Sequence, residues 1–333
     1  MSEPSQKISV SSEEAGLRLD RFVAFHNPEL SRTRVQELVN AGLILLNGKP
    51  AKDSHKLHAL DVVEVIPTPR PALKAEAENI PLEILYEDDD LLAVNKAAGM
   101  IVHAGAGTTR GTLVNALLGR GQSLSAGGDS LRPGIVHRID KETSGIVLVA
   151  KNDFAHAHLS EAFRARKVQK TYLALVQGLL KEDRGRIALP IARDPVRRNR
   201  MTARRAAALP NAREALTDWR VLTRIDSTTL LEVQIHTGRT HQIRVHFSAL
   251  RHPVVGDTLY GASGQLHVGR TSLPSLGRNF LHAAKVAFEQ PRTARPIQLL
   301  APLPAELRAY LEKLAVASGE NPTRIDAALR GFL

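Results

Sequence analysis

The stretch GIVHRIDKETSGIVLVA, residues 134–150, places a histidine, an arginine and two acidic side chains between two short apolar runs. The runs, 135–136 and 146–150, are rich in β-branched residues and predict strands. Strands that bury both faces normally exclude charge, yet Arg138 and Asp140 follow directly on the first run. We therefore predict a buried pair of strands with a polar site at its tip.

Alternation along a strand sends residues i and i+2 to the same side. If the first strand continues to residue 140, Arg138 and Asp140 lie on one face and His137 and Ile139 on the other. A polar turn over 141–145 then lets the chain fold back. This pattern predicts a carboxylate and a guanidinium together at the rim of a cleft. A structural ion pair is the alternative that the stretch by itself leaves open.

The chain has 333 residues, which suffices for two domains, and 43% of them are hydrophobic. The formal net charge of +11 favours a polyanionic partner, although a basic surface kept for solubility is the alternative. Residues 1–70 hold nine Lys/Arg and nine Asp/Glu, so the whole excess lies beyond residue 70. The chain contains no cysteine, which excludes disulfides, thiolate zinc sites and cysteine nucleophiles.

The beginning of the chain, MSEPSQKISVSSEEAG, lacks the apolar core of a signal peptide. No run approaches the roughly 18 apolar residues that a membrane-spanning helix needs. We therefore expect a cytoplasmic protein without a membrane partner.

A first module is predicted over residues 13–67. LRLDRFVAFHN has helical spacing, and Ser31 can cap a second helix with the apolar face Val35, Leu38 and Val39. A strand is expected over 43–46, a hairpin turn at Asn47-Gly48, and a closing strand in DVVEVIP. The unit resembles the S4-like (αL) RNA-binding motif. Arg32 and Arg34 lie on the early turns of the second helix, where phosphate contacts are readily made; a structural cap on the larger domain is the alternative.

Residues 68–80 mix prolines with charge and predict a linker. Beyond it, strand-like segments such as KTYLALVQG and LLEVQIHTG alternate with helical patterns. Several connections look too short for βαβ crossovers, so we predict an α+β domain with a mixed, largely antiparallel sheet. Its expected bounds are 81–315, with a C-terminal tail over 316–333.

The segment HRID-KETSG resembles the His-Arg-Leu-Asp-x-x-Thr-Ser-Gly signature of the RluA/RluD family of RNA pseudouridine synthases. Counterparts of VNKAAGMIVHAGAG…GTLVNALL, KTYLALVQG, TGRTHQIRVHFSALRHPVVGDTLYG and FLHAAKVAF occur there in the same order. HAGAG and GTLVNALL look most like the D branch, which modifies a stem-loop of large-subunit ribosomal RNA. This chain departs from the family pattern at Ile139, where leucine is more frequent, and at Ala97 and Ala104, where proline is frequent.

The resemblance implies that Asp140 is the essential carboxylate, which either attacks the nucleotide or takes a proton from the ribose. It further implies that Arg244, in Gln-Ile-Arg, pairs with this acid. Arg138 resembles the residue that enters the RNA stack as the target base flips out. Tyr172 is expected to pack on the base and to accept its C5 proton, and Leu281 to form an apolar pocket wall. Core packing is the alternative for both Tyr172 and Leu281.

Further residues are candidates for RNA contacts. The segment RDPVRRNRMTARR, residues 193–205, has six arginines and one acid and predicts a loop or hairpin tip that grips phosphates; a solvated charge run is the alternative. The glycine-rich loop that begins at His103 suits close approach to a phosphate. The full set of expected RNA-binding residues is Arg32, Arg34, His103, Arg197, Arg198, Arg200 and Arg239.

The implied reaction detaches uracil from the ribose through nitrogen and reattaches it through carbon, so we expect no cofactor. We expect no metal either, because His241 and His246 are five residues apart and do not share a helical face. The predicted function is isomerisation of specific uridines, in a stem-loop of 23S ribosomal RNA or a precursor particle, by a monomer. The alternatives are a non-catalytic RNA-binding or ribosome-assembly protein and a base-excising hydrolase.

Overall fold

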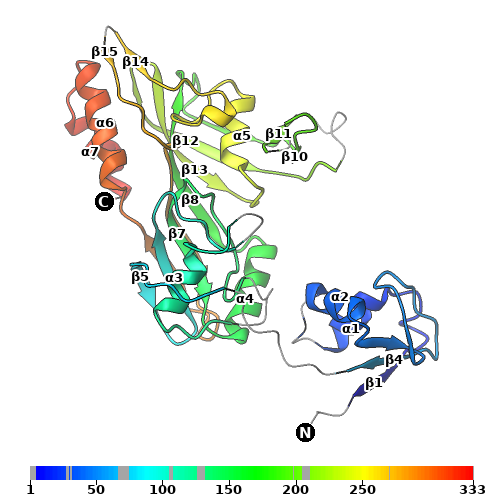
Figure 1. Ribbon diagram of the computed structural model, residues 1–333. Helices are drawn as coiled ribbons and strands as arrows, with labels where there is room; N and C mark the ends of the chain where they lie inside the picture. The colour runs from blue at the N-terminus through cyan, green and yellow to red at the C-terminus, as the bar shows by residue number, and fades with distance from the viewer. Residues whose placement is uncertain are drawn as a thin grey trace.

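The computed structural model describes residues 5–27, 30, 32–66, 75–104, 108–125, 132–197, 199–204, 211–269 and 271–332. Ser31, Arg198 and the side chains of Arg32 and Arg34 lie outside the described part of the chain. Figure 1 shows an N-terminal unit and a larger unit built around one long sheet.

The N-terminal unit combines two helices with a four-stranded antiparallel sheet of order β1-β4-β2-β3. Its elements are β1 (Gln6–Ser9), α1 (Leu19–His26), α2 (Arg32–Asn40), β2 (Ile44–Leu46), β3 (Lys49–Pro50) and β4 (Val62–Val65). The hairpin turn predicted at Asn47-Gly48 is confirmed, because both residues have the positive φ, 50° and 75°, that such a turn requires. The predicted apolar face of α2 is also confirmed: Val35, Leu38 and Val39 are buried in the core of this unit.

The larger unit contains a nine-stranded sheet of order β5-β6-β7-β16-β8-β13-β12-β9, with β17 paired to β16. Its strands are β5 (Glu83–Glu87), β6 (Leu91–Lys96), β7 (Ser144–Ala150), β8 (Gln169–Gln177), β9 (Arg184–Ile187), β12 (Thr217–Ile225), β13 (Thr228–Ile235), β16 (Leu281–Glu289) and β17 (Pro296–Leu300). The pair β7–β16 is parallel and the other pairs in this sheet are antiparallel. The mixed, largely antiparallel sheet predicted from the sequence is therefore confirmed.

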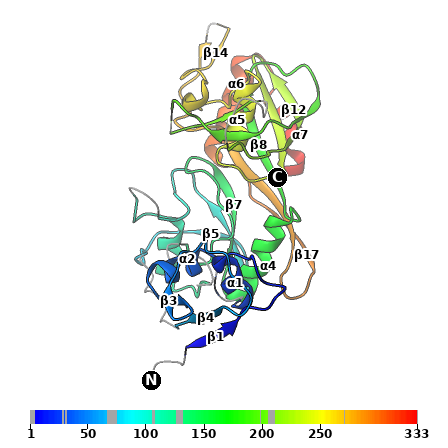
Figure 2. The ribbon, with the colours of Figure 1, turned by 90° about the vertical axis from the view of Figure 1, so that its right-hand side faces the viewer.

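Helices and two small hairpins surround this sheet. The hairpin strands are β10 (Ile191–Arg193), β11 (Met201–Ala203), β14 (His267–Val268) and β15 (Thr271–Ser272). The helices are α3 (Leu113–Gly119), α4 (Asp153–Arg164), α5 (Gln242–Ala249), α6 (Ala305–Ala317) and α7 (Thr323–Leu329), with 3-10 turns η2 (Thr258–Tyr260) and η3 (Arg330–Phe332). Helices α3 and α4 gather at the half of the sheet that holds β5 to β7, and α5 lies at the other half (Figures 1 and 2).

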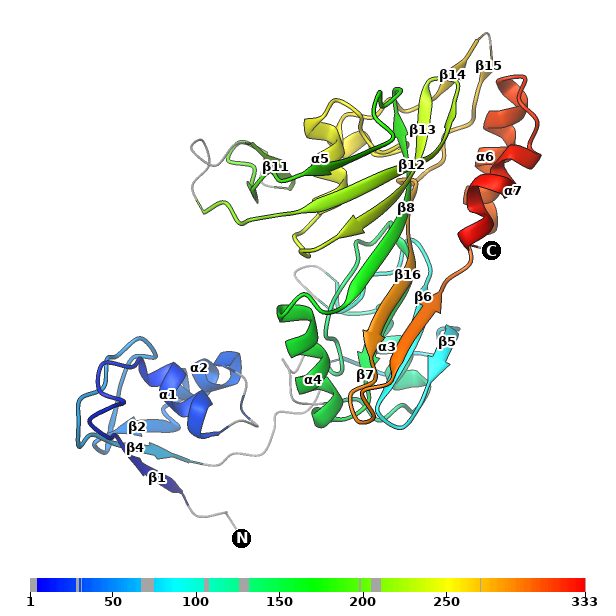
Figure 3. The same ribbon diagram turned by 180° about the vertical axis from the view of Figure 1, so that it is seen from behind.

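Both faces of the β6–β7 half are buried, as the apolar run in β7 predicts. Val147 and Val149 face the main core together with Leu113 and Leu117 of α3. Ile146 and Leu148 face the opposite side, where they pack with Leu159 of α4. Seen from behind, β8 and β16 run side by side through the middle of the sheet (Figure 3). Because the two strands are antiparallel, the start of β16 lies beside residues 172–174 of β8.

Two expectations from the sequence are wrong. Residues 137–140 are not a strand. The pairing that precedes β7 is a single bridge between Ile135 and Val149, and it does not extend to residues 137–140. Residues 316–333 were expected to form a tail, but α7 and η3 bury Ile325, Leu329 and Phe332 in the main core. The apolar residues of this short helix span too few turns for the sequence to distinguish the helix from an unstructured C-terminal tail.

A glycine allows β7 and β16 to approach closely. Gly145 has φ of +112°, and a Cβ at this position would lie 2.2 Å from the carbonyl oxygen of Ala283. Because only glycine tolerates both conditions, the parallel pairing of Gly145 with Ala283 sets the register between the two strands. This register brings the turn before β7 next to the start of β16.

Among the described residues, no helix combines the length and apolar character needed to cross a membrane.

Candidate active site

A pocket opens beside Tyr172 of β8, where β16 begins, where β13 ends and where α5 starts. It is lined by Arg138, Ile139, Asp140, Thr143, Tyr172, Ile235, Gly238, Arg239, Thr240, His241, Gln242, Ile243, Arg244 and Leu281. The five residues predicted for catalysis and base flipping, Asp140, Arg244, Tyr172, Arg138 and Leu281, all belong to this lining. The pocket therefore unites residues from four separate stretches of the sequence.

Asp140 lies in the polar turn just before β7. The backbone N–H of Thr143 donates to the carbonyl oxygen of Asp140 at 3.1 Å, which closes this turn. The side chain of Arg138 is exposed at the rim, Ile139 is buried, and Asp140 is half-buried. Arg138 and Asp140 thus reach the same pocket, as predicted, although an irregular turn and not strand alternation brings them there.

His137 points away from the pocket, as the sequence predicted. Its ring stacks on Phe163 of α4 with 4.5 Å between ring centroids, and its Nε2 accepts a hydrogen bond from the backbone N–H of Leu148 at 2.8 Å. Burial lowers the pKa of His137 to about 3. His137 is therefore a neutral structural residue that ties the turn to β7 and α4.

Arg244 approaches Asp140 from α5. Its Nη1 donates to Asp140 Oδ2 at 3.1 Å, while Nε and Nη2 donate to the two carboxylate oxygens of Asp257 at 2.6 and 2.9 Å. The side chains of Arg244 and Asp257 are 9% and 2% exposed, against 18% for Asp140. Burial by itself lowers the pKa of Arg244, but the bonds and charges of Asp257 and Asp140 outweigh it and raise that pKa above its ordinary value. Arg244 is a fixed, permanent cation beside Asp140.

Asp257 and Tyr260 were not singled out from the sequence. Tyr260 packs under Arg244, with 5.0 Å from the guanidinium carbon to the ring centroid. Its hydroxyl accepts a bond from the backbone N–H of Met201 at 2.8 Å and shares a second hydrogen bond of 2.8 Å with Nδ1 of His241. A signal was present in GDTLYG, where an acid follows an apolar run, because a buried acid is tolerated only with a cationic partner.

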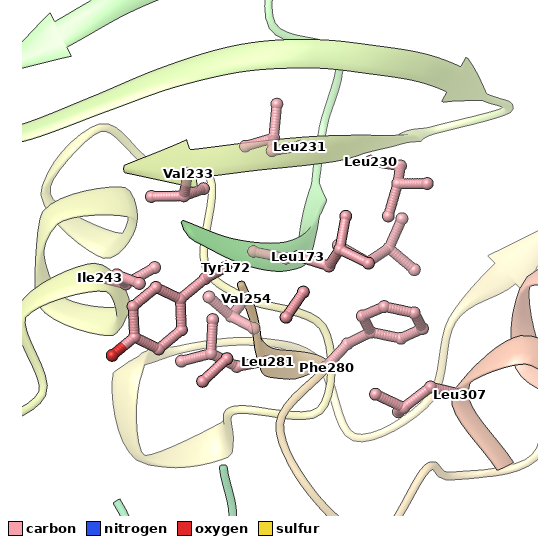
Figure 4. Packing of buried hydrophobic residues seen from close by; sticks show 14 of the residues in the cluster. Tyr172, Leu173, Leu230, Leu231, Val233, Ile243, Val254, Phe280, Leu281 and Leu307 are labelled. Atoms are coloured by element: carbon pink, nitrogen blue, oxygen red, sulfur yellow. The ribbon is translucent and has the colours of Figure 1, made fainter. Parts of the chain in front are cut away.

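Tyr172 and Leu281 form the apolar side of the pocket. Tyr172 pairs with Ala283 and Leu281 with Ala174 across β8 and β16, which places both side chains on one face of the sheet. In Figure 4 the ring of Tyr172 lies beside Ile243 and Leu281, with its hydroxyl at the edge of the cluster. Burial, followed by the charge of Asp140, raises the pKa of Tyr172 well above its ordinary value. The phenol is therefore neutral.

Two buried polar groups lie at the turn that carries Asp140, and one of them, Lys96, supports it through hydrogen bonds. Lys96 is fully buried, and its Nζ donates to the carbonyl oxygens of Ala97, Met100 and Lys141 at 2.8, 2.8 and 3.1 Å. Burial, and secondarily the charge of Arg278, lowers the pKa of Lys96 to about 7. The buried hydroxyl of Thr143 has no hydrogen-bond partner among the described residues and lines the pocket.

The residues predicted to bind RNA have different surroundings. Arg197 is exposed and Arg200 is held by Asp194 at 2.7 Å, both in the connection between β10 and β11, so the expected hairpin tip is confirmed. Arg239 lines the pocket, and its Nε donates to the carbonyl oxygen of Glu214 at 3.0 Å. The side chain of His103, which the sequence also predicts to contact RNA, is only 7% exposed. Arg198 and the side chains of Arg32 and Arg34 are outside the described residues.

Asp194 organises the connection between the hairpin strands. Its carboxylate accepts bonds from the backbone N–H groups of Val196 and Arg197 at 2.9 and 3.0 Å, as well as from Arg200. The bonds from the backbone of Arg197 and from Arg200 lower the pKa of Asp194 to about 2. The single acid of this basic segment therefore orders the arginines around it.

One group among the described residues has the ligand spacing of a metal site. Ligand atoms of His55, His58 and Asp61 in the N-terminal unit lie within 4.8 Å of one another. Both histidines are exposed, and the Asp61 carboxylate already accepts bonds from the His58 backbone and from Asn47, each at 2.8 Å. This group is unconnected with the pocket residues.

Comparison with known proteins identifies both units. A family model described as RNA pseudouridylate synthase matches residues 90–249, and a model of the S4 domain matches residues 17–63. A relative from Aquifex aeolicus, called an uncharacterized RNA pseudouridine synthase, is 46% identical over 82% of this chain and 86% of its own length. The ribosomal large subunit pseudouridine synthase D of Zymomonas mobilis is 38% identical over 95% of this chain and 99% of its own length.

Solved structures agree with this result. Human RNA pseudouridylate synthase domain containing 1 is 30% identical, has a TM-score of 0.53, and covers 68% of this chain and 85% of its own. Human RNA pseudouridylate synthase domain containing 4 is 25% identical with a TM-score of 0.55, over 69% and 92% of the two chains.

Proposed function

This chain belongs to the RNA pseudouridylate synthase family, and from that premise we propose that it isomerises specific uridines of large-subunit ribosomal RNA by means of Asp140. Relatives from Zymomonas mobilis, Xylella fastidiosa and Xanthomonas campestris, each 38 to 40% identical over at least 90% of this chain, carry the name ribosomal large subunit pseudouridine synthase D. Those names support the choice of RNA substrate.

The reaction breaks the bond from C1′ of the ribose to N1 of uracil and forms a bond from C1′ to C5. The proton on C5 is lost and N1 takes up a proton, so atoms and electrons balance without an oxidant or a second substrate. An ionised carboxylate can serve by attacking the nucleotide or by removing a ribose proton. In either role, the fixed cation Arg244 donates a charge-assisted hydrogen bond of 3.1 Å to the Asp140 carboxylate.

The target uridine must leave the RNA helix to reach this pocket, at a cost of a few kcal/mol. Arg138 is exposed at the pocket rim, where its planar guanidinium can replace the departed base in the stack. The ring of Tyr172 and the side chain of Leu281 offer apolar surface for the uracil. Because the phenol of Tyr172 is neutral, we assign it to packing on the base rather than to accepting the C5 proton.

The remaining basic residues would bind the RNA backbone. We propose that Arg197 and Arg200 of the hairpin connection and Arg239 at the pocket rim contact phosphates, and that Arg198 joins them. Arg32 and Arg34 on helix α2 of the S4 domain would position the RNA, because this domain carries little of the net charge that drives non-specific attraction.

The observation that carries this proposal is the pair Asp140–Arg244 in a pocket that also contains Tyr172, with Arg244 anchored by Asp257. Its test is the variant Asp140→Asn, which keeps the shape of the side chain but removes its charge. We expect pseudouridine formation in purified large-subunit ribosomal RNA to fall by at least about 10⁴-fold, while RNA binding is retained.

The control is Asp326→Asn, because Asp326 is an exposed acid on α7. It should behave like the unmodified enzyme in a chemical pseudouridine assay. Substantial turnover by Asp140→Asn would remove this carboxylate from the chemistry. Release of free uracil would instead identify a base-excising hydrolase.

A further inference from the structure

Lys170 lies close to the pocket but has no role in the mechanism described so far. It is the second residue of β8, two positions before Tyr172, and it pairs with Ile235 of β13. Directly paired residues share a face of the sheet, and Ile235 lines the pocket. Lys170 also pairs with Val286 of β16, which packs toward α4, so its side chain lies between the pocket and α4.

The ammonium group of Lys170 reaches the rim of this pocket. A Cβ at Gly238, which lines the pocket, would lie 3.9 Å from Lys170 Nζ. On another side the Nζ lies 5.5 Å from the ring centroid of Phe163. Because residue 238 is a glycine, no side chain at this position covers the ammonium group.

Lys170 is half-buried, yet it lacks the partners that a cation withdrawn from water normally has. Within the described residues, no carboxylate or hydrogen-bond acceptor contacts its Nζ, and burial, unopposed by any acid, lowers its pKa to about 8. Lys96 provides the contrast, because three carbonyl oxygens accept bonds from its Nζ. Removing a charge from water without compensation is unfavourable, so an unpaired, desolvated ammonium calls for an explanation.

The pocket rim beyond Gly238 also carries positive charge. Arg239 follows Gly238 in the chain, and its pKa is lowered by burial and then by the neighbouring charges of Arg213 and Arg166. The acid in this group, Glu214, is highly exposed and stands 4.0 Å from Arg166. A site of this kind attracts a strongly charged anion from outside the protein.

We propose that Lys170 binds a backbone phosphate of the RNA next to the uridine that enters the pocket. This inference rests on the proposed function, since it requires RNA to approach the pocket containing Asp140. A phosphate at the rim would give the ammonium group its missing acceptor, and it would fix the strand while Tyr172 packs against the base. Lys170 is thus a substrate-positioning residue.

The test uses a stem-loop of large-subunit ribosomal RNA that the unmodified enzyme converts. A single neutral methylphosphonate replaces, one at a time, each phosphate around the target uridine. We expect one of these replacements to lower kcat/KM of the unmodified enzyme by about 10-fold. On unmodified RNA, Lys170→Met should have a kcat/KM lowered by the same factor. The methylphosphonate at that one position should not lower the kcat/KM of Lys170→Met any further.

Two further variants complete the experiment. Lys170→Arg keeps the charge and should remain sensitive to the same methylphosphonate. Lys313→Met makes the same charge change on the exposed face of α6 and should match the unmodified enzyme. Since an unpaired charge is removed, Lys170→Met should unfold at a temperature equal to or above that of the unmodified protein.

The proposal would be overturned if the loss of kcat/KM caused by Lys170→Met multiplied with the loss caused by every methylphosphonate, because the two changes would then act independently. It would also be overturned if Lys170→Met lowered the unfolding temperature enough to account for the lost activity. Both results leave an active unmodified enzyme and so concern Lys170 alone. Failure of the unmodified protein to form pseudouridine in any ribosomal RNA would instead defeat the proposed function.

Discussion

Two arginine–aspartate pairs in this protein have nearly the same geometry but different surroundings. In the pocket, Arg244 grips Asp257 with two bonds of 2.6 and 2.9 Å; on the outer strands β9 and β12, Arg186 grips Asp218 with bonds of 2.6 and 2.8 Å. The pocket pair is 9% and 2% exposed, whereas the outer pair is 62% and 28% exposed. The two pairs therefore have similar hydrogen-bond geometry and differ in how deeply their side chains are buried.

Burial decides what each pair can do. Water can replace either partner of the outer pair, so that pair contributes little to stability. In the pocket no water can substitute for Asp257, and Arg244 is therefore held in one orientation with its remaining Nη1 on Asp140. A cation that cannot turn away is preorganised for a charged reaction site.

The largest effect is expected when the pocket cation is removed. Arg244→Ala leaves Asp257 and Asp140 without their shared partner, so we expect kcat for pseudouridine formation to fall by about 10³-fold. Stability should also fall, by about 3 kcal/mol, because a buried carboxylate is left uncompensated. Single-turnover kinetics and urea unfolding measure the two effects. An unchanged rate in a folded variant would take Arg244 out of the mechanism.

A smaller effect is expected when the anchor of that cation is weakened. Asp257→Asn preserves side-chain shape but loses the charge that fixes Arg244, so kcat should fall about 10- to 100-fold with little change in KM. The matched control is Asp218→Asn, which makes the same change in the exposed pair and should alter kcat less than about 2-fold. Equal losses in the two variants would show that burial is not what separates the pairs.

The smallest effect is expected from disrupting the exposed pair. Arg186→Ala should change the free energy of unfolding by less than about 1 kcal/mol, because its charge interaction is weakened by water. Urea unfolding at low and high salt should show an even smaller difference at high salt, where ions screen the pair. A loss of several kcal/mol would mean that Asp218 and its second partner His236, at 2.9 Å, form a stabilising network.

Local patterns in the sequence predicted much of the fold. The β-branched run of β7, the Asn47-Gly48 turn and the apolar face of α2 were read correctly, because each depends on neighbouring residues alone. The irregular segment at 137–140 and the packed helix α7 were misread. In each of these, tertiary contacts override a weak local preference.

The sequence by itself determined the family signature around Asp140, the apolar strands and the basic character of the chain, since these are properties of residue order and composition. Only the tertiary structure decided that Asp257 anchors Arg244, that Arg244 meets Asp140 across 104 positions, and that Lys170 reaches the rim at Gly238. The physical reason is register: the pairing of β8 with β13 and β16 brings distant residues to one face, and no local pattern encodes that juxtaposition.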